Sequence, residues 1–143
     1  RRSRIGSVGV LNHEAPRLSP INLKRLEYIK PGGNWTDIPD ELLPKGMQKA
    51  RKSDHTKRYG RVLPDGLAST ILTKCDPHWG AFFHYEQNRS FTVREAARLQ
   101  SFPDHFVFIG NLAEQFAQVG NAVPPLLAQA VGLSLRSVLE TED

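Results

Sequence analysis

The last third of this sequence constrains the fold most, because start and stop signals for helices follow one another there at short intervals. The run Thr92-Val93-Arg94-Glu95 is a capping box, in which the Thr92 and Glu95 side chains each accept a hydrogen bond from the other residue's amide. The helix that it begins is predicted to end near Ser101, because Pro103 disfavours helical geometry at the preceding residue.

Two further helices are predicted after this one. Asn111 and Glu114 repeat the capping pattern, and Gly120 is expected to end the second helix in a left-handed conformation. Pro124 and Pro125 suit the first turn of a third helix. One face of that helix is apolar, with Leu127, Ala130, Val131, Leu135, Val138 and Leu139 at helical spacing. Nothing earlier in the chain obviously covers this face, so we expect it to pack on another domain.

The first two thirds of the chain are predicted to form short elements joined by turns. Short helices are expected over residues 21–29, where a turn is the alternative, and 38–44. Short strands are expected over residues 1–10, 67–73 and 81–85, the last two joined by a turn at 76–80.

Composition favours a loop-rich domain and excludes membrane, collagenous, disulfide-scaffold and fully disordered proteins. Hydrophobic residues make up 39% of the chain, and its 11 Gly and 10 Pro are slightly more than average. No apolar run approaches the roughly 18 residues of a membrane span, and no secretory leader opens the chain. The single cysteine, Cys75, excludes an internal disulfide. We therefore expect a cytoplasmic protein with no membrane association.

The segment 45–61 is strongly basic, although the net charge of the whole chain is only +4. It holds seven positive charges and a single negative one, Asp54. Its basic residues are Lys45, Lys49, Arg51, Lys52, Lys57, Arg58 and Arg61. The pattern is typical of a solvated, mobile loop or of a loop that follows a phosphate backbone, and charge alone does not separate the two.

Two runs in the last third resemble the DNA cytosine-5 methyltransferases. Residues 89–106 (RSFTVREAARLQSFPDHF) resemble motif IX of that family, and residues 118–125 (QVGNAVPP) resemble its motif X. Both occur in the order and at the spacing of the family. Upstream, residues 66–71 (GLASTI) and 59–61 (YGR) resemble the family's target recognition region.

The opening residues resemble the second half of motif VIII, with its glutamine missing and with Arg2 and Arg4 at the positions of its two arginines. The family's glycine-rich cofactor loop, its Pro-Cys nucleophile loop and its Glu-Asn-Val element do not occur in this sequence. Cys75 lacks a preceding proline, so we interpret it as a partly buried thiol. Its spacing to His78 predicts no metal site, because a second pair of ligands is missing.

The resemblance implies an α+β fold: a small DNA-recognition domain of short strands and loops, followed by C-terminal helices that pack on a separate, Rossmann-like catalytic domain. Four segments follow from it. They are the end of a motif VIII-like strand at 1–11, the target recognition region at 12–88, the motif IX helices at 89–119, and motif X with the helix returning to the catalytic domain at 120–143.

The resemblance also implies an activity. The complete enzyme transfers a methyl group from S-adenosylmethionine to C5 of a cytosine that is flipped out of double-stranded DNA. The chain is then the smaller subunit of a heterodimeric split enzyme or an excised fragment, and its partner supplies the nucleophile and most of the cofactor site. A bacterial restriction–modification system is the expected setting, by analogy. The rival interpretation is a stand-alone, sequence-specific DNA-binding module without catalysis.

Three basic residues, Lys57, Arg58 and Arg61, have the reach and charge for phosphate or guanine contacts. Ser69 and Thr70 match the family position whose hydroxyl contacts the DNA backbone near the flipped nucleotide, although an ordinary strand residue is the alternative for Thr70.

Asn121 and Ala122 match the positions beside the methionine end of S-adenosylmethionine, with a helix cap as the alternative for Asn121. Trp35 and Trp79 are interpreted as packing residues rather than base-stacking ones. The charged residues of the motif IX helix are interpreted as structural rather than catalytic: Arg94, Glu95 and Arg98.

Overall fold

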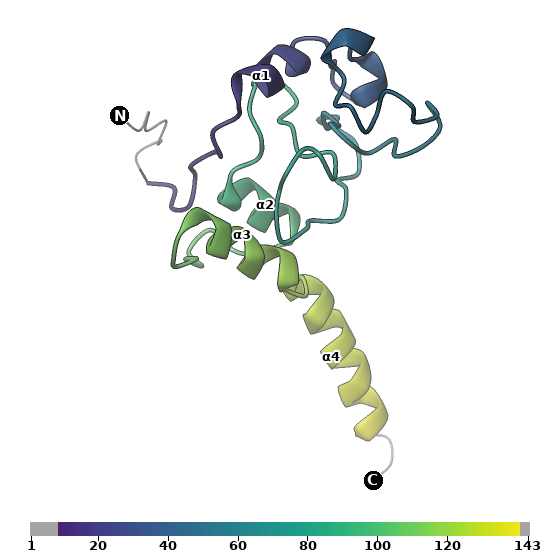
Figure 1. Cartoon of the computed structure of the whole chain (residues 1–143). Helices are drawn as coiled ribbons and strands as arrows, with labels where there is room; N and C mark the ends of the chain where they lie inside the picture. Colours follow the sequence, from purple (N-terminus) through teal and green to yellow (C-terminus); the bar gives the residue numbers. More distant parts are fainter. Residues whose placement is uncertain (1–8, 141–143) are drawn as a thin grey trace.

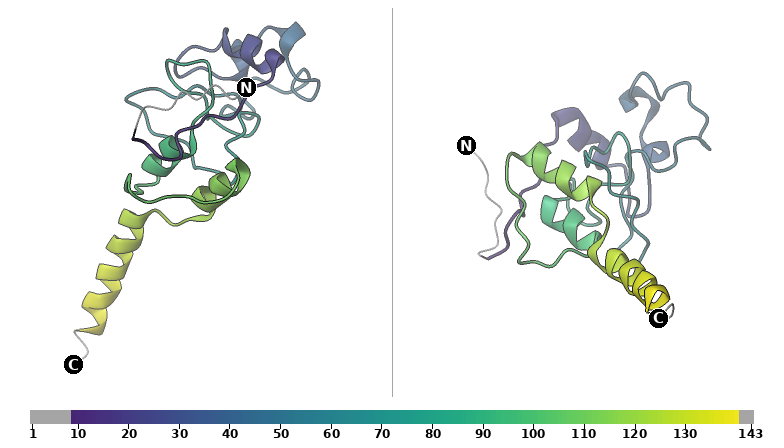
Figure 2. Two further views of the ribbon diagram at one scale, coloured as in Figure 1. Left: turned by 90° about the vertical axis from the view of Figure 1, so that its left-hand side faces the viewer. Right: turned by 90° about the horizontal axis from the view of Figure 1, so that it is seen from below.

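A computed structural model describes residues 9–140, which form short helices connected by loops. In chain order the helices are α1 (Pro20–Leu26), the 3-10 helices η1 (Trp35–Asp37) and η2 (Asp40–Leu42), α2 (Val93–Leu99), α3 (Leu112–Asn121) and α4 (Pro125–Leu139). The loops gather at one end of the molecule, together with α1. Helices α2 and α3 lie side by side, and α4 extends away from the rest (Figure 1, Figure 2). Arg2 and Arg4, and most of the strand predicted over residues 1–10, lie outside the described residues.

Both predicted capping boxes are present. The Thr92 hydroxyl accepts from the Glu95 amide at 3.1 Å, and the Thr92 amide donates to the Glu95 carboxylate at 2.8 Å. The matching distances at the start of α3 are 3.0 Å and 2.7 Å, between Asn111 and Glu114. The capping signals therefore placed α2 and α3 correctly, because they act between residues three positions apart.

The predicted role of Gly120 is wrong. Gly120 lies inside α3, and the described glycines with positive φ are Gly9, Gly32 and Gly110. A Cβ atom at position 120 would lie 2.5 Å from the carbonyl carbon of Leu72 and 2.6 Å from its oxygen. The position needs glycine because another segment approaches its backbone, which a local sequence pattern does not reveal.

The predicted strands do not form within residues 9–140. Two isolated β-bridges take their place, one pairing Arg61 with Phe83 and the other pairing Phe83 with Ser90. The segment 81–85 does bond on both sides, since the Phe83 amide donates to the Gly60 carbonyl at 3.1 Å and the Phe91 amide donates to the Phe82 carbonyl at 2.9 Å. The pairing is too short for a strand. Residues 67–73 are held by the burial of Ile71 instead of by a ladder of hydrogen bonds.

Two hydrophobic clusters form the core. The first joins the loops to α2 and α3, through Ile71, Cys75, Phe82, Phe91, Val93, Ala96, Ala97, Phe108, Phe116 and Val119. The second joins α1 to the basic segment, through Leu26, Ile29, Trp35, Ile38, Leu43, Met47, Tyr59 and Phe83. The first cluster takes residues from both sides of the predicted boundary at 88/89, so the loops before this boundary share one core with α2 and α3.

α4 contributes no buried residue to either cluster. The large apolar residues of its predicted apolar face are 51–69% exposed. They are Leu127, Val131, Leu135, Val138 and Leu139. The prediction that no earlier part of the chain covers this face is confirmed for the residues that the structure describes. What packs on it stays a prediction.

The stretch Leu112–Leu139 reaches a mean hydropathy of 1.3, so by length and composition it could cross a membrane. In the structure this stretch is two helices, and α4 has 15 residues. A helix of that length spans about 22 Å, less than the roughly 30 Å of a bilayer's hydrocarbon core. The geometry therefore offers no single helix of spanning length here.

Candidate DNA interface

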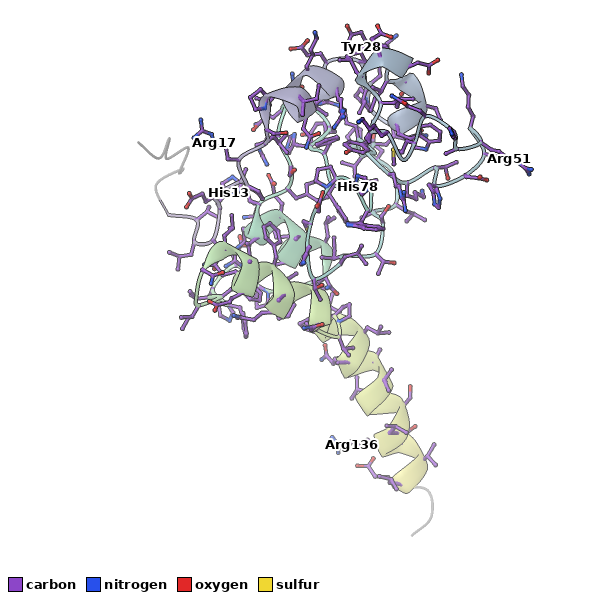
Figure 3. All side chains as sticks on the ribbon, in the orientation of Figure 1. His13, Arg17, Tyr28, Arg51, His78 and Arg136 are labelled. Atoms are coloured by element: carbon purple, nitrogen blue, oxygen red, sulfur yellow. The ribbon has the colours of Figure 1, made fainter. Side chains whose placement is uncertain are left out.

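The basic segment 45–61 forms an arm that packs on the core through buried residues and exposes its charged side chains to solvent. Met47 and Tyr59 are 2% and 4% exposed, and the Trp35 indole donates to the Asp54 carbonyl at 3.1 Å. The cations Lys45, Lys49, Arg51, Lys52 and Lys57 are exposed, and Arg51 lies near the far end of the arm (Figure 3). The arm is a packed part of the domain that presents positive charge to solvent, as a phosphate-following loop requires.

Arg58 belongs to this arm and contacts an aromatic ring. Its guanidinium carbon lies 5.0 Å from the centre of the Trp79 ring, and Trp79 is 57% exposed. Trp79 is therefore not a core residue, although its ring packs on His78 and Arg58, whereas Trp35, at 3% exposed, is packed as expected. An aromatic residue within the polar turn 76–80 was the available sign that it faces solvent.

Arg61 lies inside the protein. Its guanidinium donates to the carbonyls of Ile29 at 2.7 Å, Leu26 at 3.0 Å and His84 at 3.0 Å, and to the Asn88 side chain at 2.8 Å. Burial lowers the pKa of the guanidinium from its ordinary value. The structure thus favours a structural role for Arg61, which ties the end of α1 to the loop 84–88, over the predicted contact with DNA.

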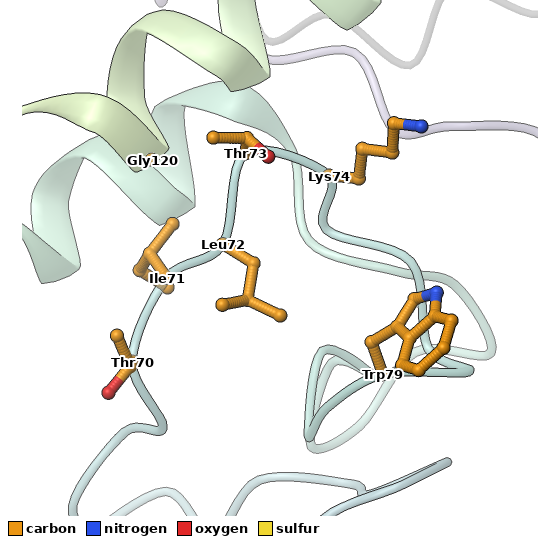
Figure 4. A pocket seen from close by; sticks show the side chains of 7 residues that line it. All are labelled: Thr70, Ile71, Leu72, Thr73, Lys74, Trp79 and Gly120. Atoms are coloured by element: carbon orange, nitrogen blue, oxygen red, sulfur yellow. The ribbon is translucent and has the colours of Figure 1, made fainter.

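A shallow depression of about 370 Å³ lies between the end of α3 and the loops (Figure 4). Its lining consists of Thr70, Ile71, Leu72, Thr73, Lys74, Trp79 and Gly120. Of the predicted DNA contacts, Thr70 is exposed on this lining and Ser69 is half-buried beside it. The structure therefore brings Thr70 and Trp79 to one surface and places Arg61 elsewhere.

The predicted cofactor residues lie at the corner between α3 and α4. Asn121 is the last residue of α3 and is exposed, so the helix continues one residue past the stop predicted at Gly120. Ala122 follows as the C-terminal cap, and its amide donates to the Val119 carbonyl at 3.3 Å. The neighbouring Gly120 lines the depression, which places the corner next to Thr70.

Two of the three charged residues of α2, Arg94 and Glu95, join neighbouring segments as predicted, whereas Arg98 forms an exposed ion pair with Asp104 at 2.6 Å. Arg94 is fully buried and donates to the carbonyls of Leu11 at 3.0 Å, Pro103 at 3.1 Å and Phe106 at 2.6 Å. Burial opposes ionisation of Glu95, but hydrogen bonds from Arg89, both at 2.7 Å, and from the capped amide outweigh it and lower the pKa of Glu95.

Asn12 is a further anchor that the sequence did not reveal. It adopts a positive φ of 61°, its side chain exchanges hydrogen bonds with the backbone of Phe108 at 2.8 Å and 3.0 Å, and its carbonyl accepts from the Arg94 amide at 3.0 Å. Asparagine tolerates this left-handed conformation better than most residues do, which was the only local sign of such a role.

Cys75 is a buried thiol, as predicted. It is 5% exposed within the first hydrophobic cluster, and burial raises its pKa to about 12. A thiol of this kind is mostly protonated at neutral pH and is a poor nucleophile. Within residues 9–140, no group of three or more His, Cys, Asp and Glu side chains is arranged to hold a metal ion.

Comparison with known proteins agrees with these motifs. The chain is 46% identical over 122 residues to the Type II methyltransferase M1.HphI of Haemophilus parahaemolyticus, which covers 85% of this chain and 30% of that protein. It is 39% identical over 133 residues to the Type II methylase M.HgiDII of Herpetosiphon aurantiacus, covering 90% and 38%. It is 38% identical over 151 residues to DNA (cytosine-5)-methyltransferase 3 of Arabidopsis thaliana, covering 94% and 11%.

The chain thus spans 38% or less of the length of each of these relatives. Residues 22–137 match the family profile described as C-5 cytosine-specific DNA methylase. Because that match takes in most of the chain, including both capped helices and most of α4, this protein belongs to the C-5 cytosine-specific DNA methylase family.

Proposed function

We propose that this chain is the DNA-recognition and cofactor-completing portion of a DNA (cytosine-5-)-methyltransferase. The complete enzyme transfers a methyl group from S-adenosylmethionine to C5 of a flipped cytosine in double-stranded DNA. The observation that carries the proposal is the family match over residues 22–137. Two of the relatives are bacterial and are named as Type II enzymes, which supports a bacterial cytoplasmic restriction–modification setting.

The exposed face of α4 supports a catalytic partner subunit or domain. Leu127, Val131, Leu135 and Leu139 are more than half exposed, at helical spacing along a helix that extends from the domain (Figure 1). Burying large apolar side chains of this kind stabilises an assembly by roughly 1.5–3 kcal/mol each. A catalytic, Rossmann-like domain packed on this face would give the helix the cover that residues 9–140 do not provide.

The surface near the depression supports the DNA role. Thr70 and Lys74 line it, and the basic arm presents Lys57 to solvent. Lys57 and Lys74 are flexible point charges that suit phosphates, while the hydroxyls of Ser69 and Thr70 suit the DNA backbone near the flipped nucleotide.

The corner at Asn121 fits one end of the cofactor. The exposed Asn121 carboxamide has both a donor and an acceptor, so it suits the ammonium and carboxylate of an amino acid. The Ala122 amide already bonds to Val119, so Ala122 contributes contact rather than a free donor. S-adenosylmethionine supplies the methyl group when it is bound, and the partner's residues hold most of it.

Reconstitution tests the proposal. The chain is combined with a catalytic part from the same genome that carries the family's Pro-Cys and glycine-rich loops, and transfer of labelled methyl groups to duplex DNA is measured. We expect transfer by the mixture and none by either part alone. Transfer by the chain alone would overturn the two-part arrangement. Sequence-specific DNA binding with no methyl transfer by any such mixture would favour the stand-alone binding module.

A further inference from the structure

Among residues 9–140, the guanidiniums of Arg25, Arg58 and Arg94 lie over aromatic rings, and that of Arg25 also donates to the Leu42 carbonyl at 2.7 Å. Those of Arg61 and Arg94 donate to backbone carbonyls, and that of Arg89 donates to Glu95. The Arg58 side chain makes no hydrogen bond or ion pair within residues 9–140 and lies over the Trp79 ring. A guanidinium that rests on an aromatic face keeps the N–H donors on its edges free for a ligand.

The Trp79 ring is exposed but firmly held. The backbone amide of Trp79 donates to the Asp76 carbonyl at 3.0 Å. The His78 ring packs edge-on against the Trp79 ring, with 5.2 Å between the ring centres. His78 is bonded in turn to the Tyr59 hydroxyl at 3.1 Å, and the Tyr59 amide donates to the Pro77 carbonyl at 2.7 Å. These contacts fix the turn that carries Trp79 to Tyr59, the neighbour of Arg58 in the chain. Arg58 and Trp79 are therefore held close together before any ligand binds.

The pair also lies at the surface already assigned to DNA. Trp79 forms one side of the depression whose other lining includes Thr70 and Lys74 (Figure 4). Lys57 precedes Arg58 in the chain and is exposed. The flexible lysines suit phosphates, which any DNA sequence offers, whereas a guanidinium fixed in orientation suits an acceptor of fixed geometry.

We propose that Arg58, held on Trp79, reads a guanine of the target DNA and so determines part of its recognition sequence. The paired acceptors O6 and N7 on the major-groove edge of guanine match the guanidinium fork. Trp79 is a positioning residue in this arrangement, because its ring limits the orientations that Arg58 adopts. The proposal rests on the proposed function only in that duplex DNA is the ligand.

Selection from random DNA tests this inference. The full chain and its variants are incubated with a duplex library carrying a randomised central stretch, and the bound molecules are sequenced. The unmodified chain is expected to enrich guanine at a specific position. Arg58→Lys keeps the charge but loses the fork, so the preference for guanine there should fall by about 5- to 150-fold. Trp79→Leu should weaken the preference at the same position.

Lys57→Ala is the matched control. It should leave the guanine preference unchanged and lower the slope of log affinity against log salt by about 0.9, as expected for one lost phosphate contact. Circular dichroism and thermal melting check that every variant is folded.

Two outcomes would overturn the inference: no enriched guanine for the unmodified chain, or an unchanged preference in Arg58→Lys. A fall in the salt slope without a change of preference would make Arg58 a phosphate contact and would also overturn it. The readout is binding, so a chain that selects guanine through Arg58 but never supports methyl transfer contradicts the proposed function alone.

Discussion

Gly120 of α3 lies directly against the backbone of Leu72, so close that a Cβ atom at position 120 would meet the Leu72 carbonyl carbon at 2.5 Å. Both residues line the depression beside the predicted DNA contacts. The contact joins the corner between α3 and α4 to the loop 70–74 without an intervening side chain. The position of Thr70 relative to Asn121 therefore depends on the absence of a side chain at residue 120.

Gly120→Ala should destabilise the chain by about 1–3 kcal/mol, because backbone atoms must move to admit the methyl group. Gly132→Ala is the matched control, since Gly132 lies in α4 with open space around it and alanine favours a helix by up to about 1 kcal/mol. The free energy of unfolding, measured by urea denaturation, should fall in the first variant and stay level or rise in the second. Equal stability of the two variants would contradict the close contact.

Those parts of the fold that depend on near neighbours could be predicted from the sequence. The capping boxes at Thr92 and Asn111 and the prolines before α4 act within one helical turn, and the structure confirms all three helices. The apolar face of α4 was predicted for the same reason, because the helical period alone determines which side chains share a face.

Features that depend on long-range contacts were not predicted. Gly120 matched a helix stop, but its neighbour is Leu72, and Arg61 matched a DNA contact, but its acceptors lie more than twenty residues away in the sequence. The segment 67–73 has strand-like residues, yet Ile71 is held by the core rather than by a paired strand. The contact between Arg58 and Trp79 could not be predicted from a local pattern, because the two residues belong to separate loops.

Arg61→Leu should destabilise the chain by about 3 kcal/mol or more, because several partly buried carbonyls lose their donor at once. Lys57→Ala, which removes an exposed charge from the same arm, should change stability by less than about 0.5 kcal/mol. Thermal unfolding of both variants checks the difference. Unchanged stability together with a large loss of DNA affinity in Arg61→Leu would support the contact with DNA instead.

Acidification should destabilise the chain in two steps. Burial, followed by the charge of Arg89, lowers the pKa of His84 below 6.5, so the unfolded chain takes up this proton at a higher pH than the folded chain does. The free energy of unfolding should therefore fall as the pH drops below about 6.5. Glu95, whose pKa is lowered from 4.5, should add a second loss as the pH falls below that value.

His84→Asn tests the first step. The Nδ1 atom of His84 accepts from the Glu86 and Gln87 amides, both at 3.1 Å, and an asparagine oxygen can accept similar bonds without titrating. The variant should show a shallower loss of stability between about pH 7.5 and 5.5. His55→Asn, at an exposed position, should keep the original pH dependence. An unchanged profile in His84→Asn would assign that step to another group.

Cys75 should be unreactive in the folded chain. Because burial raises its pKa to about 12, alkylation by iodoacetamide at neutral pH should be slow and should accelerate when denaturant unfolds the protein. Cys75→Ala should leave methyl transfer by the reconstituted enzyme intact, since in the proposed two-part arrangement the catalytic part supplies the nucleophile. Loss of both transfer and the covalent adduct with fluorocytosine-containing DNA would show that Cys75 takes part in the chemistry.

A charge on the apolar face of α4 should weaken assembly without unfolding the domain. Val131 and Leu135 are 51% and 61% exposed, so Val131→Glu and Leu135→Glu should change the chain's own stability by less than about 0.5 kcal/mol. In the assembly each loses roughly 1.5–3 kcal/mol of apolar burial, which corresponds to about 10- to 150-fold weaker association.

Gln129→Glu is the matched control. It adds the same charge on the side of α4 that carries Arg136 and Glu140, whose side chains form an exposed ion pair at 2.6 Å. Titration of the catalytic part into each variant should show weakened methyl transfer for the two apolar positions and normal transfer for Gln129→Glu. Equal transfer by all three variants would mean that this face is not where the catalytic part binds.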